Sequence, residues 1–334
     1  MSCVESKRDP VFDLLKGIAI FMVVLSHVIG YRDGFSHIDE KSYTANFIAM
    51  CNMHIFFAVS GYFSVKVINA TVLLRRIVNY FWPCAMFAIL YGLFNFVSWR
   101  DFPLVAIKAF FFNNWFFLVL AFCDITLYLA RKSRHEMLIL LICFITSSCI
   151  ADHVWYMSFY QEMLPFYVLG QYLFPIIKKR GRSSWMCMGL VAYLTVVFFT
   201  GNVAANGLGF YWDHFVLLNP SLRSFLNLVA RFAVGVLGVV TLVFIANSLL
   251  LRFRWVRFLG NMIGQRTLQI FFIHGFLVHC ISNRFCKLDT PMPILYLSAI
   301  AITGMSVGLT LATEASCIVA RLFWGPFNLK SKRR

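Results

Sequence analysis

The feature that most constrains this chain is a series of long apolar segments that follow one another along almost its whole length. A helix needs about 20 apolar residues to cross the ~30 Å hydrocarbon core of a bilayer. Segments near that length occupy residues 11–29, 46–66, 77–98, 115–130, 136–151, 156–177, 185–200, 226–251, 267–286 and 292–322. Together they leave no room for a soluble domain. The sequence therefore predicts an all-α, polytopic transmembrane bundle of about ten spans, forming one membrane-embedded domain over residues 1–334.

Two of these segments have features of their own. The segment 292–322 is too long for one straight buried helix, so we expect a break within it. The segment 11–29 contains Asp13 and Lys16, and no small-residue cleavage site follows it. It therefore differs from a secretory signal peptide, and we expect it to remain as the first helix.

The charge distribution predicts how the spans are oriented. Only 13% of the residues are charged, about half of the usual share in soluble domains, and the net charge is +16. Most basic residues fall in alternate connections, near residues 7–8, 66–76, 131–134, 178–182, 252–266 and 330–334. Basic residues mark the cytoplasmic side of membrane proteins. The charge therefore indicates two cytoplasmic termini rather than a nucleic-acid partner.

The first span carries an ionisable stripe. A charge in the hydrocarbon region costs at least about 2.5–3.5 kcal/mol, so it usually faces a cavity or a partner. Lys16 and His27 lie on one helical face, about 20° and about 16 Å apart, and Asp13 lies one turn before Lys16. This stripe is typical of a polar passage into the bilayer. Alternatively, Lys16 extends to the membrane surface and His27 is an interface histidine.

Three further ionisable residues have two readings each. Arg75 and Arg76 open the third span, where they either anchor the helix or bind a phosphate group. Glu162 is expected at a depth similar to that of His27, and it either orients that imidazole or pairs with Arg231. No GxSxG, P-loop, GxGxxG, HExxH or CxxC motif occurs, so the sequence predicts no metal site and no permanently bound cofactor.

One connection has a composition that suits a sugar. Residues 201–225 are rich in Gly, Asn and aromatic residues, although this composition also suits any ordered loop.

Six short segments, in order, carry a family resemblance. They are Asp13-Leu14-Leu15-Lys16 with His27 eleven residues after Lys16, Phe56–Tyr62, Arg75-Arg76-Ile77 ahead of Pro83, Trp115–Leu118, Leu164–Gly170 and Leu268–His274. Together they resemble the acyltransferase-3 family of integral-membrane acyltransferases, which O-acetylate bacterial surface polysaccharides. The length is most similar to that of the stand-alone sugar O-acetylases, which are fucose 4-O-acetylase-like.

The resemblance implies an activity and a location. We expect a bacterial, multi-pass enzyme of the cytoplasmic membrane, with acyl-CoA as co-substrate. It would move an acetyl or similar short acyl group to a hydroxyl of a surface polysaccharide or lipid-linked sugar.

The resemblance also implies roles for residues of this chain. His27 would be the general base, or alternatively would carry a transient acyl group, and Glu162 would orient it. Lys16, Arg75 and Arg76 would hold the anionic part of CoA, with Asp13 orienting Lys16. The pocket candidates are Asn52, His54, Ser60, Trp115 and His274.

Two other classes of membrane protein also place ionisable residues within spans. A secondary transporter or flippase should show repeated Gly/Pro-broken helix pairs, and no such pairs are visible. A lipid-linked sugar polymerase or ligase usually has a large outer loop with paired Arg or carboxylates. The segment 201–225 has one Asp and one Arg, which matches that description poorly.

Overall fold

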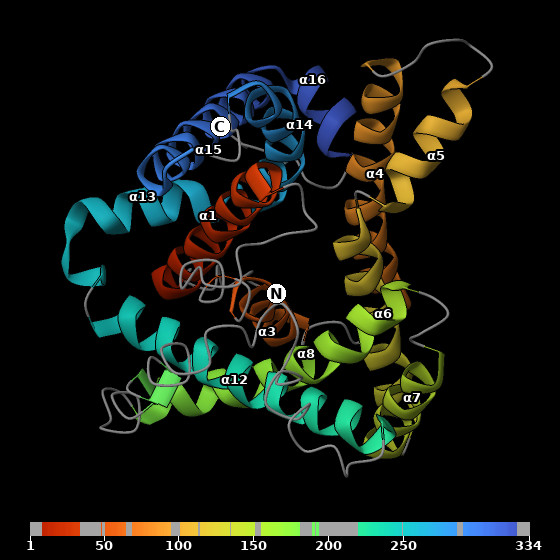
Figure 1. Cartoon of the computed structure of the whole chain (residues 1–334). Coiled ribbons are helices and arrows are strands. Elements are labelled where there is room, and N and C mark those ends of the chain that lie inside the picture. The colour runs from red at the N-terminus through yellow and green to blue at the C-terminus, as the bar shows by residue number, and fades with distance from the viewer. Residues whose placement is uncertain are drawn as a thin grey trace, which may run out of the picture.

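The computed structural model of the chain is helical throughout the part that it describes. It describes residues 9–33, 48, 51–64, 69–94, 101–112, 114–133, 135–150, 155–180, 189–190, 192–193, 220–248, 250–285 and 290–325. Over these residues there is no strand, and the helices pack into one bundle (Figure 1). This confirms the predicted all-α class.

Each predicted span except 185–200 contains a described helix, and most of 185–200 lies outside the described residues. These helices are α1 (Pro10–Asp33), α3 (Asn52–Ser64), α4 (Ala70–Phe94), α6 (Trp115–Lys132), α7 (Glu136–Ile150), α8 (Trp155–Arg180), α12 (Pro220–Ser248), α14 (Thr267–Phe285), α15 (Met292–Ala315) and α16 (Cys317–Trp324). The segment 292–322 breaks between α15 and α16, where the Ser316 side chain accepts a hydrogen bond from the Val319 N–H. The break that its length predicts is therefore confirmed.

Several of these helices can cross a membrane by length and apolarity alone. Among the described residues α1, α4 and α15 do so singly. Helices α5 (Phe102–Phe112) and α6 form a bent pair, with an angle of 54°, that would make a fourth span. The chain is thus a helical membrane bundle, and the total of about ten spans stays a prediction.

Two described helices lie where the sequence indicated only connections. Helix α5 pairs with α4, and α13 (Arg254–Gly264) packs on α1. Both have 11 residues, which is too short for a span. A search for segments of about 20 apolar residues therefore passes over them.

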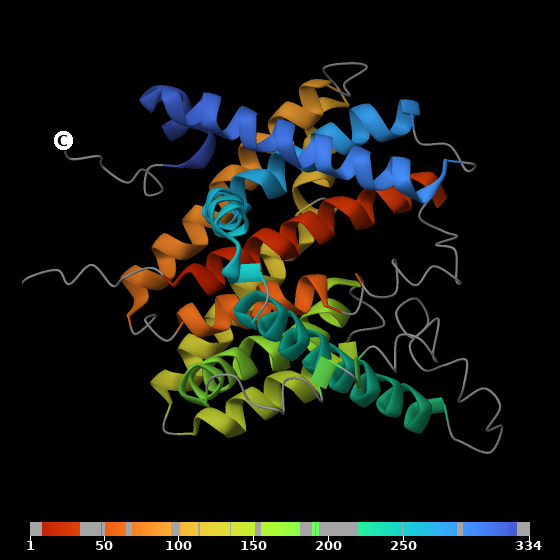
Figure 2. The same cartoon turned by 90° about the vertical axis from the view of Figure 1, so that its left-hand side faces the viewer.

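Helix α1 is the centre of the bundle. It contacts α3, α12, α13, α14 and α15, and these helices surround it in Figure 2. Leu15, Ile20, Val24 and Val28 are fully buried along it. The ionisable stripe that starts at Asp13 therefore runs through the protein interior.

Helices α3 and α8 touch through their backbones at two glycines. A Cβ on Gly61 would lie 1.8 Å from the Tyr167 carbonyl oxygen, and a Cβ on Gly170 would lie 1.9 Å from that of Ala58. Small residues at such seams let membrane helices approach closely. Gly61 and Gly170 therefore allow the close approach of α3 and α8.

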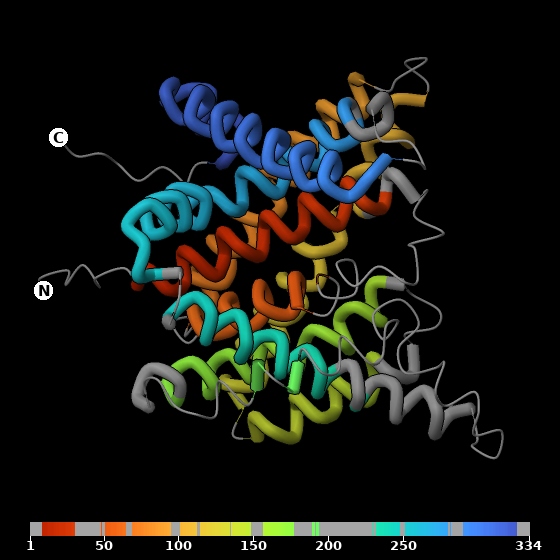
Figure 3. Tube along the Cα trace, turned by 60° about the vertical axis from the view of Figure 1, so that its left-hand side comes forward, coloured from red at the N-terminus to blue at the C-terminus, as the bar shows by residue number. Residues whose placement is uncertain are grey.

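The described chain begins and ends on the same side of the bundle. Helix α1 starts, and α16 ends, toward the left of Figure 3. We call this side the inner end of the bundle, and we call the side where α1 ends the outer end. An even number of spans gives this arrangement.

Candidate functional site

A cavity of about 620 Å³ lies toward the outer end of the bundle. Its walls come from α1, α3, α4, α5, α14 and the start of α6. Pockets for small ligands commonly have volumes of about 300–1,000 Å³, with few polar groups on apolar walls. The polar and aromatic lining residues include Ser26, His27, Asn52, Tyr91, Asn114, Trp115, His274 and His279. The cavity therefore has the size and composition of a small-molecule site.

Four of the sequence-predicted site residues meet at this cavity. His27, Asn52, Trp115 and His274 come from four different helices and line its wall. Trp115 is held by stacking on Phe159, with ring centroids 4.2 Å apart. The sequence places these residues on separate spans, and the tertiary structure brings them together.

The imidazoles of His27 and His274 are neighbours. Their ring centroids are 5.4 Å apart, and the ring planes are tilted by 46°. His274 is 2% exposed, whereas His27 is only partly buried. Two nitrogen bases thus share one wall of the cavity.

The hydrogen bond of His274 decides which of its nitrogens carries the proton. Nδ1 lies 3.0 Å from the carbonyl oxygen of Ile270. A carbonyl only accepts, so Nδ1 donates, and in a neutral ring Nε2 carries the lone pair. Nε2 has no hydrogen-bond partner among the described residues. It is thus left as a hydrogen-bond acceptor for a ligand.

Four of these lining residues, Ser26, Tyr91, Asn114 and His279, were outside the predicted site. The Asn114 amide donates to the carbonyls of Ala109 and Phe110, both at 3.2 Å, so it closes the last turn of α5. Tyr91 and His279 have ring centroids 6.0 Å apart. The Asn-Asn pair at 113–114, between two apolar runs, was a turn signal that could have located this corner.

Glu162 and His54 form a buried pair. Glu162 Oε1 lies 3.3 Å from His54 Nε2, and both residues are less than 9% exposed. His54 also packs on Phe166, with ring centroids 4.4 Å apart. The described contact of Glu162 is thus with His54, and its predicted contact with His27 stays a prediction. The side chain of Arg231, the alternative partner, lies outside the described residues.

His54 and Ser60 were also pocket candidates. Neither is among the described residues that line the cavity. Ser60 is partly buried in α3, one residue before the Gly61 seam.

Lys16 and Asp13 lie toward the inner end of α1. Lys16 Nζ is 2.8 Å from Asp13 Oδ1, and the Lys16 side chain keeps a quarter of its surface exposed. Because α1 is one continuous helix from Pro10 to Asp33, the axial distance from Lys16 to His27 is about 16 Å, as predicted. The helix thus connects a cationic inner end with the cavity.

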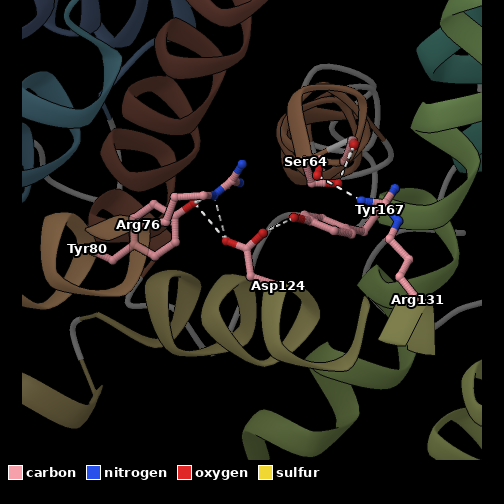
Figure 4. Close-up of polar contacts among 7 residues, drawn as sticks. Ser64, Arg76, Tyr80, Asp124, Arg131 and Tyr167 are labelled. Atoms are coloured by element: carbon pink, nitrogen blue, oxygen red, sulfur yellow. Dashed lines mark hydrogen bonds and ion pairs between the residues drawn. The ribbon is translucent and has the colours of Figure 1, made fainter. Parts of the chain in front are cut away.

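Arg76 is held by a buried carboxylate. Its Nε donates to Asp124 Oδ2 at 3.0 Å, and its Nη2 donates to the Tyr80 hydroxyl at 3.0 Å. The Tyr80 and Tyr167 hydroxyls both donate to Asp124 (Figure 4). The Asp124 side chain is fully buried, so these donors compensate its charge. Asp124 was outside the predicted site, although a lone carboxylate within a predicted span was a signal that could have found it.

Arg75 and Arg131 differ from Arg76 in their surroundings. Arg75 is exposed at the start of α4. Arg131 donates to the Ser64 carbonyl at 2.9 Å, at the end of α3, and to Gln171 of α8. A cation at a helix C-terminus stabilises the helix dipole. Arg131 therefore joins α3, α6 and α8 near the inner end.

Two further predictions concern features that the structure tests only in part. The segment 201–225, predicted as a possible sugar loop, lies outside the described residues up to 219, and α12 begins at Pro220. Over the described residues, no group of three or more His, Cys, Asp or Glu side chains could hold a metal ion.

Comparison with known families gives one match. The family model described as an acyltransferase domain, Acyl_transf_3, matches residues 9–313. The match covers the helices that form the cavity and both ends of the Lys16–His27 stripe. No curated protein and no solved structure matches the chain.

Proposed function

Because the chain belongs to the acyltransferase-3 family of membrane acyltransferases, we propose that it transfers an acetyl or similar short acyl group from cytoplasmic acyl-CoA to a sugar hydroxyl. We further propose that it lies in the cytoplasmic membrane of a bacterium, and that the sugar belongs to a surface polysaccharide or a lipid-linked precursor. The observation that carries the proposal is the position of His27 on the wall of the outer cavity.

The proposed reaction begins with proton transfer to His27. A neutral imidazole is available near pH 7, and a positioned base of this kind accelerates proton transfer. His27 takes the proton of the acceptor hydroxyl, and the hydroxyl oxygen attacks the thioester carbonyl carbon. The carbon–sulfur bond breaks, CoA leaves as a thiolate, and His27 returns the proton to the sulfur. The products are the sugar ester and free CoA.

The cavity offers groups that suit a sugar. Nε2 of His274 accepts a hydrogen bond, and the Asn52 amide both donates and accepts. The indole of Trp115 presents an apolar surface of the kind that covers a sugar ring face. We assign the acceptor sugar to this cavity.

The cationic inner end supports a place for the anionic part of CoA. Lys16, Arg75 and Arg76 are the proposed contacts, with Asp13 and Asp124 fixing Lys16 and Arg76. Cations that are already oriented bind phosphate with less loss of side-chain freedom. An extended pantetheine arm would then bring the thioester toward His27 along α1.

Replacement of His27 tests the proposal. In His27→Ala we expect acyl transfer from radiolabelled acetyl-CoA to extracted surface glycan to fall by about 10²–10⁴-fold, since the base is lost. The matched control is His135→Ala, because His135 is an exposed histidine outside the cavity. Both variants must insert in the membrane at the wild-type level. Retained transfer by His27→Ala would remove His27 from the role, and no glycan labelling by the wild type would favour a transporter or a polymerase.

A further inference from the structure

Helix α13 divides its surface into three different faces. At about 100° per residue, Val256, Gly260 and Gly264 share one face, and all three are buried. A second face carries Trp255, Phe258 and Leu259, which are exposed by 65%, 67% and 39%. The third face carries Arg254, Arg257 and Asn261, all of them exposed. An amphipathic helix on the surface of a soluble protein has one buried apolar face and one exposed polar face. Helix α13 has in addition an apolar face that is exposed, and burial in the protein does not explain it.

The buried face fixes α13 firmly on α1. A Cβ on Gly264 would lie 1.8 Å from the Asp13 carbonyl oxygen, and a Cβ on Gly260 would lie 2.7 Å from Leu14 Cδ1. The two backbones are therefore in contact near the inner end of α1. The other two faces of α13 are thus presented in a fixed direction.

The direction of α13 differs from that of the spans. In Figure 2, α13 is seen nearly end-on, whereas α1 runs across the view. Since α1 is long and apolar enough to cross the membrane, a helix that crosses it steeply lies along the membrane surface. Its contact with Asp13 places it at the inner end.

The exposed arginines of α13 differ from a nearby arginine that has a partner. Arg266, two residues beyond α13, donates to Glu314 at 3.0 Å. Within the described part of the chain, neither Arg254 nor Arg257 has an ion-pair or side-chain hydrogen-bond partner. Two cations beside exposed aromatic rings match a membrane interface, where rings lie at the level of the headgroups.

We propose that α13 is an interfacial helix that binds the phosphate headgroups of anionic phospholipids in the inner leaflet. Arg254 and Arg257 contact the headgroups, and Trp255 and Phe258 insert between the first segments of the acyl chains. Each basic residue near an anionic surface strengthens binding by roughly fivefold. This site is independent of the cavity and of the proposed acyl transfer.

Spin-labelled lipids test the proposal on the whole protein. The protein is reconstituted in phosphatidylcholine vesicles that contain a small amount of spin-labelled phosphatidylglycerol or phosphatidylcholine. We expect electron paramagnetic resonance to show more motionally restricted phosphatidylglycerol than phosphatidylcholine. In R254Q/R257Q this preference should fall by roughly tenfold or more, because two basic residues that each strengthen binding by roughly fivefold are removed. R254K/R257K should keep most of it, because the charges remain.

The control removes two other exposed basic residues near the inner end. K132Q/R321Q loses the same charge elsewhere and should keep the preference for phosphatidylglycerol. An unchanged preference in R254Q/R257Q, or an equal fall in the control, overturns the proposal. If R254Q/R257Q instead loses affinity for free CoA and keeps its lipid preference, the arginines belong to a CoA site, which also overturns it.

Fluorescence quenching gives a second measurement that does not depend on the arginines. The difference in tryptophan emission between the wild type and Trp255→Phe reports on Trp255. We expect lipids brominated near the glycerol to quench this emission more than lipids brominated near the chain ends. Stronger quenching by the deep bromines would place Trp255 within the hydrocarbon core and contradict an interfacial helix.

Discussion

At the scale of single residues, two cations near the inner end are each paired with a carboxylate. Lys16 pairs with Asp13 at 2.8 Å, and Arg76 pairs with Asp124 at 3.0 Å. A charge within a membrane protein is stabilised by a partner or a polar cavity. The two cations keep similar shares of their side-chain surface open, 25% for Lys16 and 21% for Arg76, and the pairs differ in the carboxylate, because Asp124 is fully enclosed. We therefore expect Arg76 to stabilise the fold as well, because it neutralises an enclosed carboxylate.

Lys16 should act mainly on the binding of acyl-CoA. We expect Lys16→Ala to raise KM for acyl-CoA at least tenfold, since a charge-assisted contact contributes about 1.5–3 kcal/mol. Lys16→Arg should retain much of the affinity, because the charge stays in place. Steady-state kinetics with acyl-CoA as the varied substrate measure the change. An equal loss in both variants would speak against a role for the charge.

Arg75 and Arg76 should respond differently to the same substitution. Arg75→Gln should raise KM for acyl-CoA and leave thermal stability unchanged, because Arg75 is exposed. Arg76→Gln should also lower the melting temperature, since it leaves Asp124 buried without its cation, a loss of about 3–5 kcal/mol. Thermal unfolding in detergent compares the two variants. Equal melting temperatures would contradict the structural role of Arg76.

At the scale of helices, two of the family-like segments are explained by packing. Phe56–Tyr62 and Leu164–Gly170 lie on α3 and α8, which touch at Gly61 and Gly170. These segments hold the helices that carry Asn52, His54 and Glu162. Their role in the site is therefore indirect, since they determine the distance between the two helices.

A methyl group at this seam should separate the helices. Gly61→Ala or Gly170→Ala places a Cβ within 2 Å of a backbone oxygen, so the backbones must move apart. We expect a loss of at least about 1–3 kcal/mol and a lower melting temperature. Gly304→Ala is the matched control, because nothing lies within 4 Å of a Cβ there. Destabilisation of the control by the same amount would show that the seam is not the cause.

At the scale of the whole molecule, the cavity and the cationic residues lie toward opposite ends of α1. The cavity is formed by α1, α3, α4, α5, α14 and the start of α6, and the inner end adds α13 and the end of α6. This separation suits a reaction whose two substrates approach from opposite sides of a membrane. It depends on the orientation of the bundle, which can be measured directly.

Reporter fusions should show the orientation and the placement of α13. We expect fusions after Phe253 and after Gln265 to give fluorescent green fluorescent protein and inactive alkaline phosphatase, because the distribution of basic residues predicts that both ends of α13 face the cytoplasm. Fusions after Asp101 and after Thr290 should give the opposite result. Active phosphatase after only one of the first two positions would mean that α13 crosses the membrane.

The sequence by itself determined the class of the protein and the positions of most of its helices. A segment in hydrocarbon must satisfy its own backbone hydrogen bonds, so each long apolar run becomes a helix wherever its neighbours lie. The same local rule placed Asp13, Lys16 and His27 on one face of α1, because helical geometry fixes their spacing.

Only the tertiary structure decided which side chains meet across helices. The contacts of Glu162 with His54, Arg76 with Asp124 and His27 with His274 join residues 48 or more positions apart. They form only because three pairs of helices pack in particular rotations. Those rotations follow from the shapes of whole surfaces, such as the glycine seam between α3 and α8. No periodicity within one segment encodes them. The site is thus a property of packing, although four of its residues, His27, Asn52, Trp115 and His274, had already been singled out in the sequence.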